Sequence, residues 1–246
     1  MTAKPRAVVV TGGGKGIGRA VVARFAAAGD HVIAVGRDRE ALEAVEAAEA
    51  EVCDVTDEAQ VATLFERLGT VDVLVNNAGV ATSAPLERTT LDEWGTHLDV
   101  NATGAFLCTR AAVGGMIERG NGRIVTVAST AGLVGARYTA AYTASKHAAV
   151  GLMRAVAAEV AGTGVTANAV CPAYVRTEMT RRSIARIVAA TNRSEEEAEA
   201  ALVATSPLGR LLEPEEVAFA VAFLADPTAG AINGQTLVLD GGGIQA

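Results

Sequence analysis

Residues 7–18 read Ala-Val-Val-Val-Thr-Gly-Gly-Gly-Lys-Gly-Ile-Gly and join an apolar run to a glycine-rich turn, and a helical pattern follows from Gly16. The run of small and β-branched apolar residues predicts a strand that is buried on both faces. Glycine lets the backbone turn sharply and approach a pyrophosphate, and the N-terminus of the next helix offers free N–H groups to an anion. The stretch therefore predicts a nucleotide-binding turn after the first strand of an α/β sheet.

Short apolar runs alternate with longer helical patterns along the rest of the chain. The expected strands are Arg6–Thr11, His31–Gly36, a short segment at Glu51–Cys53, Val71–Asn76, Gly122–Ser129, Val165–Val170 and Gln235–Leu239. The expected helices are Gly16–Ala28, Arg39–Glu49, Glu58–Leu68, Leu91–Arg119, Tyr142–Ala161 and Pro214–Ala225. This alternation predicts a parallel sheet with helices on both faces and right-handed crossovers.

The segment Glu178–Pro207 departs from the alternation, because it is rich in Arg, Glu and Ala and has no strand partner. Inserted segments beside a ligand crevice often act as lids, so we expect a substrate lid here, with an exposed pair of surface helices as the alternative. No linker or repeat interrupts residues 1–246. We therefore expect one cofactor-binding catalytic domain.

Composition excludes several classes of partner. The formal net charge of −7 argues against nucleic acid. The chain has no Lys/Arg run, no apolar stretch long enough to span a bilayer and no signal-peptide pattern, so we expect a cytoplasmic protein that does not bind membranes. Its three cysteines and three histidines are scattered, so no metal site is expected.

Two of the three lysines lie in patterns with chemical meaning, whereas arginine serves nearly everywhere else. Lys15 lies inside the glycine turn. Lys146 follows Tyr142 by four residues, which places an ammonium and a phenol one helical turn apart on one face. A nearby ammonium favours the ionised phenol and so lowers its pKa. The pair predicts a tyrosine that exchanges a proton near neutral pH.

Further motifs occur in the order and spacing of a known family. They are Thr11-Gly12-x-x-x-Gly16-Ile17-Gly18, Asp54-Val55 after the third strand, Asn76-Asn77-Ala78-Gly79 after the fourth, Asn101, Ser129 thirteen residues before Tyr142, and Asn233-Gly234-Gln235 through Asp240-Gly241-Gly242. With these motifs the chain resembles the short-chain dehydrogenase/reductase family over almost its full length. The resemblance implies a Rossmann-type, doubly wound sheet of seven parallel strands in the order 3-2-1-4-5-6-7.

The resemblance also implies a cofactor site. Asp54 and Val55 would hold the adenine ring, and Val175 and Thr177 match positions that contact the carboxamide end. The implied cofactor-binding residues are Gly12, Lys15, Gly16, Ile17, Gly18, Arg37, Asp54, Val55, Asn77, Ala78, Gly79, Tyr142, Lys146, Pro172, Val175 and Thr177.

The end of the second strand decides between NAD and NADP. An NAD enzyme usually places a carboxylate there, whereas this chain has Gly36 and Arg37. Arg37 and Lys15 could converge on a 2′-phosphate, and the same pair resembles that of NADP-preferring family members. Asp38 is interpreted as the N-cap of the next helix. We therefore expect NADP(H).

The implied catalytic residues are Asn101, Ser129, Tyr142 and Lys146. Ser129 would donate a hydrogen bond to the substrate oxygen, where charge develops. Asn101 would hold a water that links Lys146 to solvent, and Lys146 would also bond the nicotinamide ribose. Tyr138, Ala173 and Tyr174 are expected in the substrate pocket.

The loop after the sixth strand departs from the family pattern. Pro172-Ala173 stands where the family often has Pro-Gly, so this loop cannot adopt every glycine conformation. Arg176 is expected either to meet an anionic substrate tail or to pair with Glu178.

The resemblance is nearest to 3-oxoacyl thioester reductases, acting on acyl carrier protein (ACP) or CoA substrates, and to polyketide ketoreductases. It implies NADPH-dependent reduction of a ketone to a secondary alcohol, and a homotetramer built on Leu91–Arg119 and Tyr142–Ala161. One alternative is a secondary-alcohol or 3-hydroxyacyl dehydrogenase that works oxidatively. Another is a regulator that senses NADP without turnover.

Overall fold

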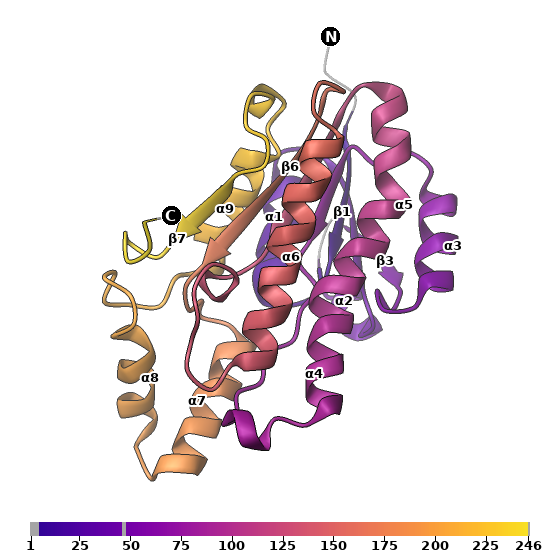
Figure 1. Cartoon of the computed structure of the whole chain (residues 1–246). Coiled ribbons are helices and arrows are strands. Elements are labelled where there is room, and N and C mark those ends of the chain that lie inside the picture. Colours follow the sequence, from indigo (N-terminus) through magenta and orange to yellow (C-terminus); the bar gives the residue numbers. More distant parts are fainter. Residues whose placement is uncertain (1–4, 46–47, 246) are drawn as a thin grey trace.

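The computed structural model describes residues 5–45 and 48–245. Within them, seven strands form one parallel sheet in the order β3-β2-β1-β4-β5-β6-β7, which confirms the predicted fold class (Figure 1). The strands are β1 (Ala7–Thr11), β2 (His31–Gly36), β3 (Ala48–Val52), β4 (Val73–Asn76), β5 (Gly122–Val127), β6 (Val165–Pro172) and β7 (Thr236–Leu239). The strand order reverses between β1 and β4, and ligands of such sheets bind in the crevice at this point.

Helices cover both faces of the sheet. They are α1 (Gly16–Ala27), α2 (Arg39–Glu43), α3 (Glu58–Leu68), α4 (Leu91–Leu98), α5 (Gly104–Arg119), α6 (Ala140–Glu159), α7 (Glu178–Thr191), α8 (Glu195–Val203) and α9 (Pro214–Leu224). Figure 1 shows α5 and α6 in front of the sheet and α1 and α9 behind it. Along β1, Val9 belongs to the core under α3, α5 and α6, while Val8 and Val10 belong to the core under α1 and α9. The strand is therefore apolar on both faces because each face carries a helix layer.

The expected helix Arg39–Glu49 and the expected strand Glu51–Cys53 were partly wrong. The helix α2 ends at Glu43, and β3 begins at Ala48 and pairs with β2, whereas residues 46 and 47 lie outside the described residues. Alanine and glutamate favour helix, but this propensity is a weak prior. Pairing with the edge of the sheet overrides it here.

The expected helix Leu91–Arg119 is not continuous. A π-helical turn, Asp99–Thr103, separates α4 from α5. Asn101 lies in this turn, and its side chain binds both backbone groups of Val80 in the loop after β4. Wide turns of this kind occur mostly inside α-helices and often at functional sites.

Other boundaries moved by a few residues. Helix α6 begins at Ala140 instead of Tyr142, β5 ends at Val127 instead of Ser129, and β6 continues to Pro172. The segment Glu178–Pro207 contains α7 and α8, which share a small core of Ile184, Ala198 and Leu202. These two helices extend away from the sheet in Figure 1.

Arg123 fastens the amino ends of the strands. Its guanidinium donates hydrogen bonds to four backbone carbonyl oxygens, those of Gly122 (2.8 Å), Gly164 (3.1 Å), Asp226 (3.3 Å) and Pro227 (3.0 Å). The residue is buried, and burial lowers the pKa of its guanidinium. The four carbonyls compensate for this burial, because a buried charge needs hydrogen-bond partners.

Replacement of Gly164 by alanine is expected to lower the free energy of unfolding by about 3 kcal/mol. Gly164 has φ +86°, and a Cβ there would lie 2.1 Å from the carbonyl oxygen of Gly120. Gly162→Ala is a matched control, because Gly162 has φ +81° and nothing lies within 4 Å of a Cβ there. It should cost about 1 kcal/mol, from backbone strain alone. If urea denaturation showed equal losses in the free energy of unfolding for Gly164→Ala and Gly162→Ala, the clash with Gly120 would be contradicted.

No helix within residues 5–45 and 48–245 is both long and apolar enough to cross a membrane. The same residues contain no group of three or more His, Cys, Asp or Glu side chains that could hold a metal ion. Cys53, Cys108 and Cys171 are buried free thiols. Burial raises their pKa values to about 11, 12 and 11, so all three stay protonated and unreactive at neutral pH.

Candidate active site

The residues expected at the site lie where the chain leaves the carboxyl ends of the strands. The glycine turn follows β1, Asn77–Gly79 follows β4, Ser129 follows β5, and the Pro172–Thr177 loop begins at the end of β6. Because these strands are parallel neighbours, their carboxyl ends meet at one edge of the sheet. Residues that are far apart in sequence are brought together there.

The glycine turn needs glycine for both conformation and space. Gly12 and Gly16 have φ of +66° and +51°, which side chains rarely adopt. A Cβ on Gly18 would lie 2.1 Å from the carbonyl oxygen of Gly12. The N-cap of α1 is Lys15, which makes no side-chain capping bond, so the first N–H groups of α1 remain available to an anion. This turn fits a dinucleotide pyrophosphate.

Thr11 ties the glycine turn to the loop after β4, a role that the sequence analysis missed. Its hydroxyl oxygen accepts hydrogen bonds from the backbone N–H groups of Asn77 and Ala78, both at 3.0 Å. The Asn77 side chain donates in return to the carbonyl oxygens of Thr11 (2.9 Å) and Gly12 (3.2 Å). The two loops that would flank a dinucleotide are therefore held in fixed relation.

The two cations expected at the adenosine end are each paired with a carboxylate. Lys15 Nζ lies 2.5 Å from Asp38 Oδ2, and Arg37 Nη1 lies 3.5 Å from Asp54 Oδ2. Asp38 also accepts from the backbone N–H of Ala41 and caps α2, as the sequence predicted. The Lys15 hydrogen bond lowers the pKa of Asp38. Exposed pairs of this kind contribute little stability, so an incoming phosphate could compete for both cations.

Asp54 and Val55 follow β3 at the same edge. Burial acts to raise the pKa of Asp54, but hydrogen bonds from Thr56 and the charge of Arg37 lower it overall. Val55 packs against α5, where a Cβ on Gly104 would lie 2.7 Å from the Val55 Cγ2 atom. Glycine at position 104 therefore allows the helix to approach this loop closely.

Lys146 is a buried ammonium beside Tyr142. Lys146 Nζ donates to the carbonyl oxygen of Val127 at 2.9 Å and lies 5.9 Å from the centre of the Tyr142 ring. The side chain is 6 % exposed, and burial lowers its pKa to about 8. The group therefore remains mostly protonated at neutral pH.

The pKa of Tyr142 differs from the sequence-based expectation. Burial raises it, and the hydrogen bond with Ser129 only opposes this rise. The expected lowering by Lys146 was wrong for the protein alone, because desolvation of the phenolate dominates the shift and, among the described residues, the only group that opposes it is Ser129. Ser129 also accepts a hydrogen bond from the backbone N–H of Ala131 at 3.1 Å, which orients its hydroxyl.

Asn101 braces the loop after β4. Its Oδ1 accepts from the N–H of Val80 (2.8 Å), and its Nδ2 donates to the Val80 carbonyl (3.0 Å) and to Ser145 Oγ (2.9 Å). A Cβ on Gly79 would lie 3.1 Å from Asn101 Oδ1 and 3.6 Å from Lys146 Nζ. Gly79 thus keeps space open beside both polar groups.

The loop after β6 is tied into the sheet. Ala173 N–H donates to the carbonyl oxygen of Leu239 at 3.0 Å, and the residue does not have a positive φ, so glycine is not required there. Val175 is buried and bridges to Leu212. Thr177 caps α7, and its methyl carbon would lie 3.2 Å from a Cβ on Gly16. The start of α7 therefore lies against the glycine turn.

Arg176 does not pair with Glu178, so that one of the two expected alternatives was wrong. Its Nε lies 3.0 Å from Glu213 Oε1 and its Nη1 lies 3.6 Å from Glu199 Oε1. The backbone N–H of Arg176 binds Leu212, which brings the side chain next to Glu213. Glu178 pairs instead with two arginines of its own helix, Arg181 and Arg182.

Tyr138 and Tyr174 lie on different loops around the tetrad, which is formed by the four expected catalytic residues, Asn101, Ser129, Tyr142 and Lys146. Tyr138 has φ +65°, is 56 % exposed and accepts a hydrogen bond on its carbonyl from Ala84 N–H at 2.8 Å. A non-glycine residue at positive φ is strained, and such strain clusters at functional sites. Tyr174 packs against the small core of α7 and α8, and burial raises its pKa.

A family model with the description Enoyl-(Acyl carrier protein) reductase matches residues 12–243. The chain belongs to the short-chain dehydrogenase/reductase family. This confirms the resemblance and makes the protein an oxidoreductase.

Among its relatives, the acetoacetyl-CoA reductase of Rhizobium meliloti is 38 % identical over 245 residues, covering 96 % of this chain and 98 % of the relative. A variant of the actinorhodin polyketide ketoreductase, solved with NADPH, is 39 % identical, with 97 % of each chain covered and a TM-score of 0.90. A protein of Beutenbergia cavernae described as an NAD(P)-dependent gluconate 5-dehydrogenase, solved with NADP, is 42 % identical, with 96 % of each chain covered and a TM-score of 0.87.

In this short-chain dehydrogenase/reductase, His97 is a further residue at the site that sequence analysis did not identify. It is 1 % exposed, and its ring lies edge-on to the ring of Tyr142, with the centres 6.3 Å apart. Its position in the turn before Asn101 is the only clue that the sequence contains. That clue is weak, because a lone histidine in a helix is more often a packing residue.

Proposed function

We propose that this protein is an NADPH-dependent ketoreductase that converts the ketone of a 3-oxoacyl thioester, carried on ACP or CoA, or of a polyketide, to a secondary alcohol. The observation that carries the proposal is the grouping of Ser129, Tyr142 and Lys146 at one edge of the sheet, beside the glycine turn. The names of the acetoacetyl-CoA reductase and the polyketide ketoreductase support this substrate class.

The described residues fit NADP(H). The glycine turn and the free first turn of α1 would hold the pyrophosphate, and Asp54 and Val55 would flank the adenine. Lys15 and Arg37 would exchange their carboxylate partners for the 2′-phosphate. When bound, NADPH supplies the hydride for the reduction. The remaining implied contacts are Gly12, Gly16, Ile17, Gly18, Asn77, Ala78, Gly79, Tyr142, Lys146, Pro172, Val175 and Thr177.

The tetrad provides the proton and the charge stabilisation. Ser129 donates a hydrogen bond to the substrate oxygen as negative charge develops on it. The raised pKa of Tyr142 keeps the phenol protonated at neutral pH, so it can give its proton to the alkoxide. Lys146 stabilises the phenolate that this transfer leaves, and Asn101 would place the water that returns the proton from solvent.

The segment 178–207 would form the substrate lid of one catalytic domain, with Tyr138, Ala173 and Tyr174 lining the pocket below it. Arg186 of α7 supports this role, because its Nη1 donates to the carbonyl oxygen of Ala81 at 3.3 Å. That contact joins α7 to the loop after β4, across the edge of the sheet where the tetrad lies. The carbonyl substrate would enter beneath it.

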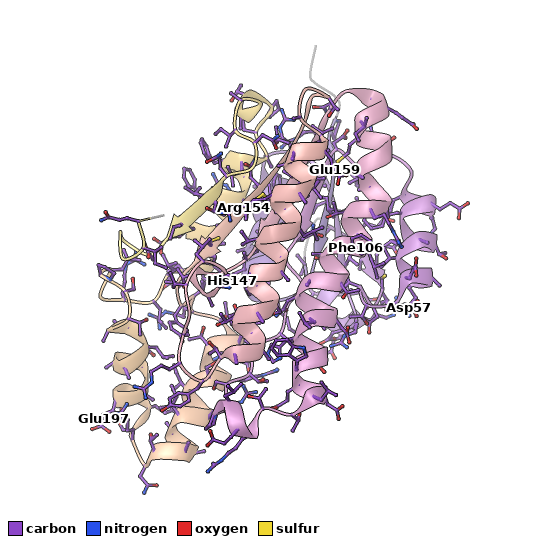
Figure 2. The ribbon with its side chains drawn as sticks, viewed as in Figure 1. Asp57, Phe106, His147, Arg154, Glu159 and Glu197 are labelled. Atoms are coloured by element: carbon purple, nitrogen blue, oxygen red, sulfur yellow. The ribbon has the colours of Figure 1, made fainter. Side chains whose placement is uncertain are left out.

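We further propose a homotetramer in the cytoplasm, with no nucleic acid or membrane partner. Figure 2 shows Phe106 of α5 and His147, Arg154 and Glu159 of α6 on one exposed face. Ile117 extends this mixed polar and apolar face, and Phe219 and Phe223 of α9 expose a separate, apolar face. A tetramer with D2 symmetry needs at least two kinds of interface, which these faces would provide. Sedimentation equilibrium would test this oligomeric state.

The direct test is oxidation of NADPH at 340 nm with acetoacetyl-CoA. Turnover of crotonyl-CoA alone would favour the enoyl reduction in the family description, and NADP-dependent oxidation of gluconate alone would favour the dehydrogenase. If a broad ketone panel produced no oxidation of bound NADPH, the NADP-sensing regulator would be the better assignment. Each of these three outcomes would contradict the assignment of the protein as a ketoreductase.

Replacement of Lys15 or Arg37 by alanine is expected to raise the KM for NADPH by about 10-fold or more, because each removes a hydrogen bond to a phosphate dianion. The KM for NADH should stay within about two-fold, since NADH has no 2′-phosphate to lose a bond. Arg39→Ala is the matched control, because Arg39 lies nearby but pairs with Glu43. Equal changes with both cofactors would contradict the assignment.

A further inference from the structure

We propose that His97 is a positioning residue of the ketoreductase, which holds the loop after β4 through Thr82 and packs the ring of Tyr142 in place. The inference rests on the proposed function, because it assumes that Tyr142 acts on the substrate. His97 lies at the end of α4, one helical turn before Asn101.

The hydrogen bonds of His97 fix its tautomer. Its Nε2 faces the backbone N–H of Thr82 at 3.0 Å, and this N–H can only donate, so Nε2 is the acceptor. Its Nδ1 lies 2.6 Å from the carbonyl oxygen of Glu93, which can only accept, so Nδ1 carries the proton. Both ring nitrogens are therefore used by the backbone, and the neutral imidazole is the form that fits.

Three successive residues of the loop after β4 are held from three different elements. Asn101, in the π turn, binds both backbone groups of Val80. Arg186, in α7, binds the carbonyl oxygen of Ala81. His97, in α4, binds the N–H of Thr82. The loop thus connects the tetrad residue Asn101 to the proposed lid, and His97 fixes its far end.

His97 also contacts the proton donor directly. Its ring and that of Tyr142 have centres 6.3 Å apart and planes at 76°, the edge-to-face arrangement that aromatic pairs favour. With His97 only 1 % exposed, the contact is dry. The ring therefore limits the positions that the Tyr142 phenol can take.

An apolar side chain would fill this space without the cost of burying a polar ring. Leucine or phenylalanine, however, would leave the N–H of Thr82 without its acceptor. The hydrogen bond to Thr82 therefore explains why a residue with an acceptor stands at position 97. The contact with Tyr142 explains why that residue is aromatic. These two contributions can be separated by substitution.

His97→Phe keeps an aromatic ring against Tyr142 but removes the acceptor for Thr82. It should raise the KM for acetoacetyl-CoA by about 10-fold and change kcat by less than about three-fold. His97→Gln keeps an acceptor near the position of Nε2 but removes the ring. It should lower kcat by about 3- to 10-fold and leave KM within about two-fold. Both variants are measured with saturating NADPH, per mole of protein that binds NADPH in a fluorescence titration.

The inference is supported if His97→Phe changes mainly KM and His97→Gln changes mainly kcat. If both variants kept the kcat and KM of the unmodified protein and lost only melting temperature, His97 would be a packing residue and the inference would be overturned. If kcat fell and KM rose by the same factors in His97→Phe and in His97→Gln, the inference would be overturned as well. The proposed function is tested separately in the unmodified protein, whose inactivity on all ketones would overturn both.

Discussion

Tyr142→Phe is expected to lower kcat for ketone reduction by about 1,000-fold, because the phenol is the proton donor and general acids contribute factors of this order. The phenyl ring preserves the packing against His97, so the variant should fold as the unmodified protein does. Tyr142 is one of many implied cofactor contacts, so loss of its hydroxyl should weaken NADPH binding by no more than about five-fold. Initial rates of NADPH oxidation with acetoacetyl-CoA measure the loss. The melting temperature of the variant checks its folding, and a titration with NADPH checks its cofactor binding.

The matched control for this substitution is Tyr138→Phe. Tyr138 lies in the proposed pocket, and its hydroxyl accepts a hydrogen bond from Arg137 at 3.4 Å, whereas Lys146 lies beside Tyr142. Loss of the Tyr138 hydroxyl should therefore raise the KM for the ketone and leave kcat within about three-fold. If Tyr142→Phe turned over ketones at the unmodified rate, proton donation by Tyr142 would have to be abandoned. A large kcat loss in Tyr138→Phe alone would assign the donor role to Tyr138.

Lys146→Met is expected to act in opposite directions on activity and stability. It should lower kcat by about 100-fold or more, because the phenolate left by Tyr142 loses its neighbouring positive charge. It should raise the free energy of unfolding of the protein alone at pH 7 by about 2 kcal/mol, because it removes a charge that burial disfavours. Urea denaturation and initial rates on the same preparations measure the two effects.

The pH dependence of stability provides the check on Lys146. Its pKa is about 8 in the folded protein and 10.5 in the unfolded chain, so the unfolded state binds more protons between these values. Lys146 therefore contributes a gain in stability as pH rises from about 8 to 10.5, whereas the three buried thiols contribute a loss above their ordinary pKa of 9.0 in both proteins. The free energy of unfolding of the unmodified protein minus that of Lys146→Met should rise over this range. Parallel stability curves for the two proteins over this range would contradict the buried ammonium.

The parallel sheet could be predicted from sequence because its determinants are local or sequential, whereas the strand order was implied by the resemblance to the short-chain dehydrogenase/reductase family. The run Ala7–Thr11 is apolar at every position except the last, and the glycines after it have a short-range reason to be glycine, namely the positive φ of Gly12 and Gly16. Alternation of strands and helices then leaves few topologies. The pairing of Tyr142 with Lys146 followed from one helical turn, and the place of Ser129 beside them was implied by the family resemblance.

The features that escaped prediction depend on contacts between distant segments. The π turn at Asn101 is explained by hydrogen bonds to Val80, and the conversion of Ala48–Val52 to a strand by pairing with β2. The partner of Arg176 is Glu213, which the sheet topology brings next to it. The raised pKa of Tyr142 reflects desolvation, which spacing along a helix cannot express.

The four carbonyls gathered by Arg123 lie at the amino ends of the strands, away from the tetrad. One buried anchor of the frame and the reactive residues thus lie at opposite poles of the molecule. Loops at the reactive pole can accumulate changes during evolution while the other pole keeps the frame closed. A scaffold divided in this way is suited to acquiring new substrates by loop exchange, since each change alters recognition more than it alters folding.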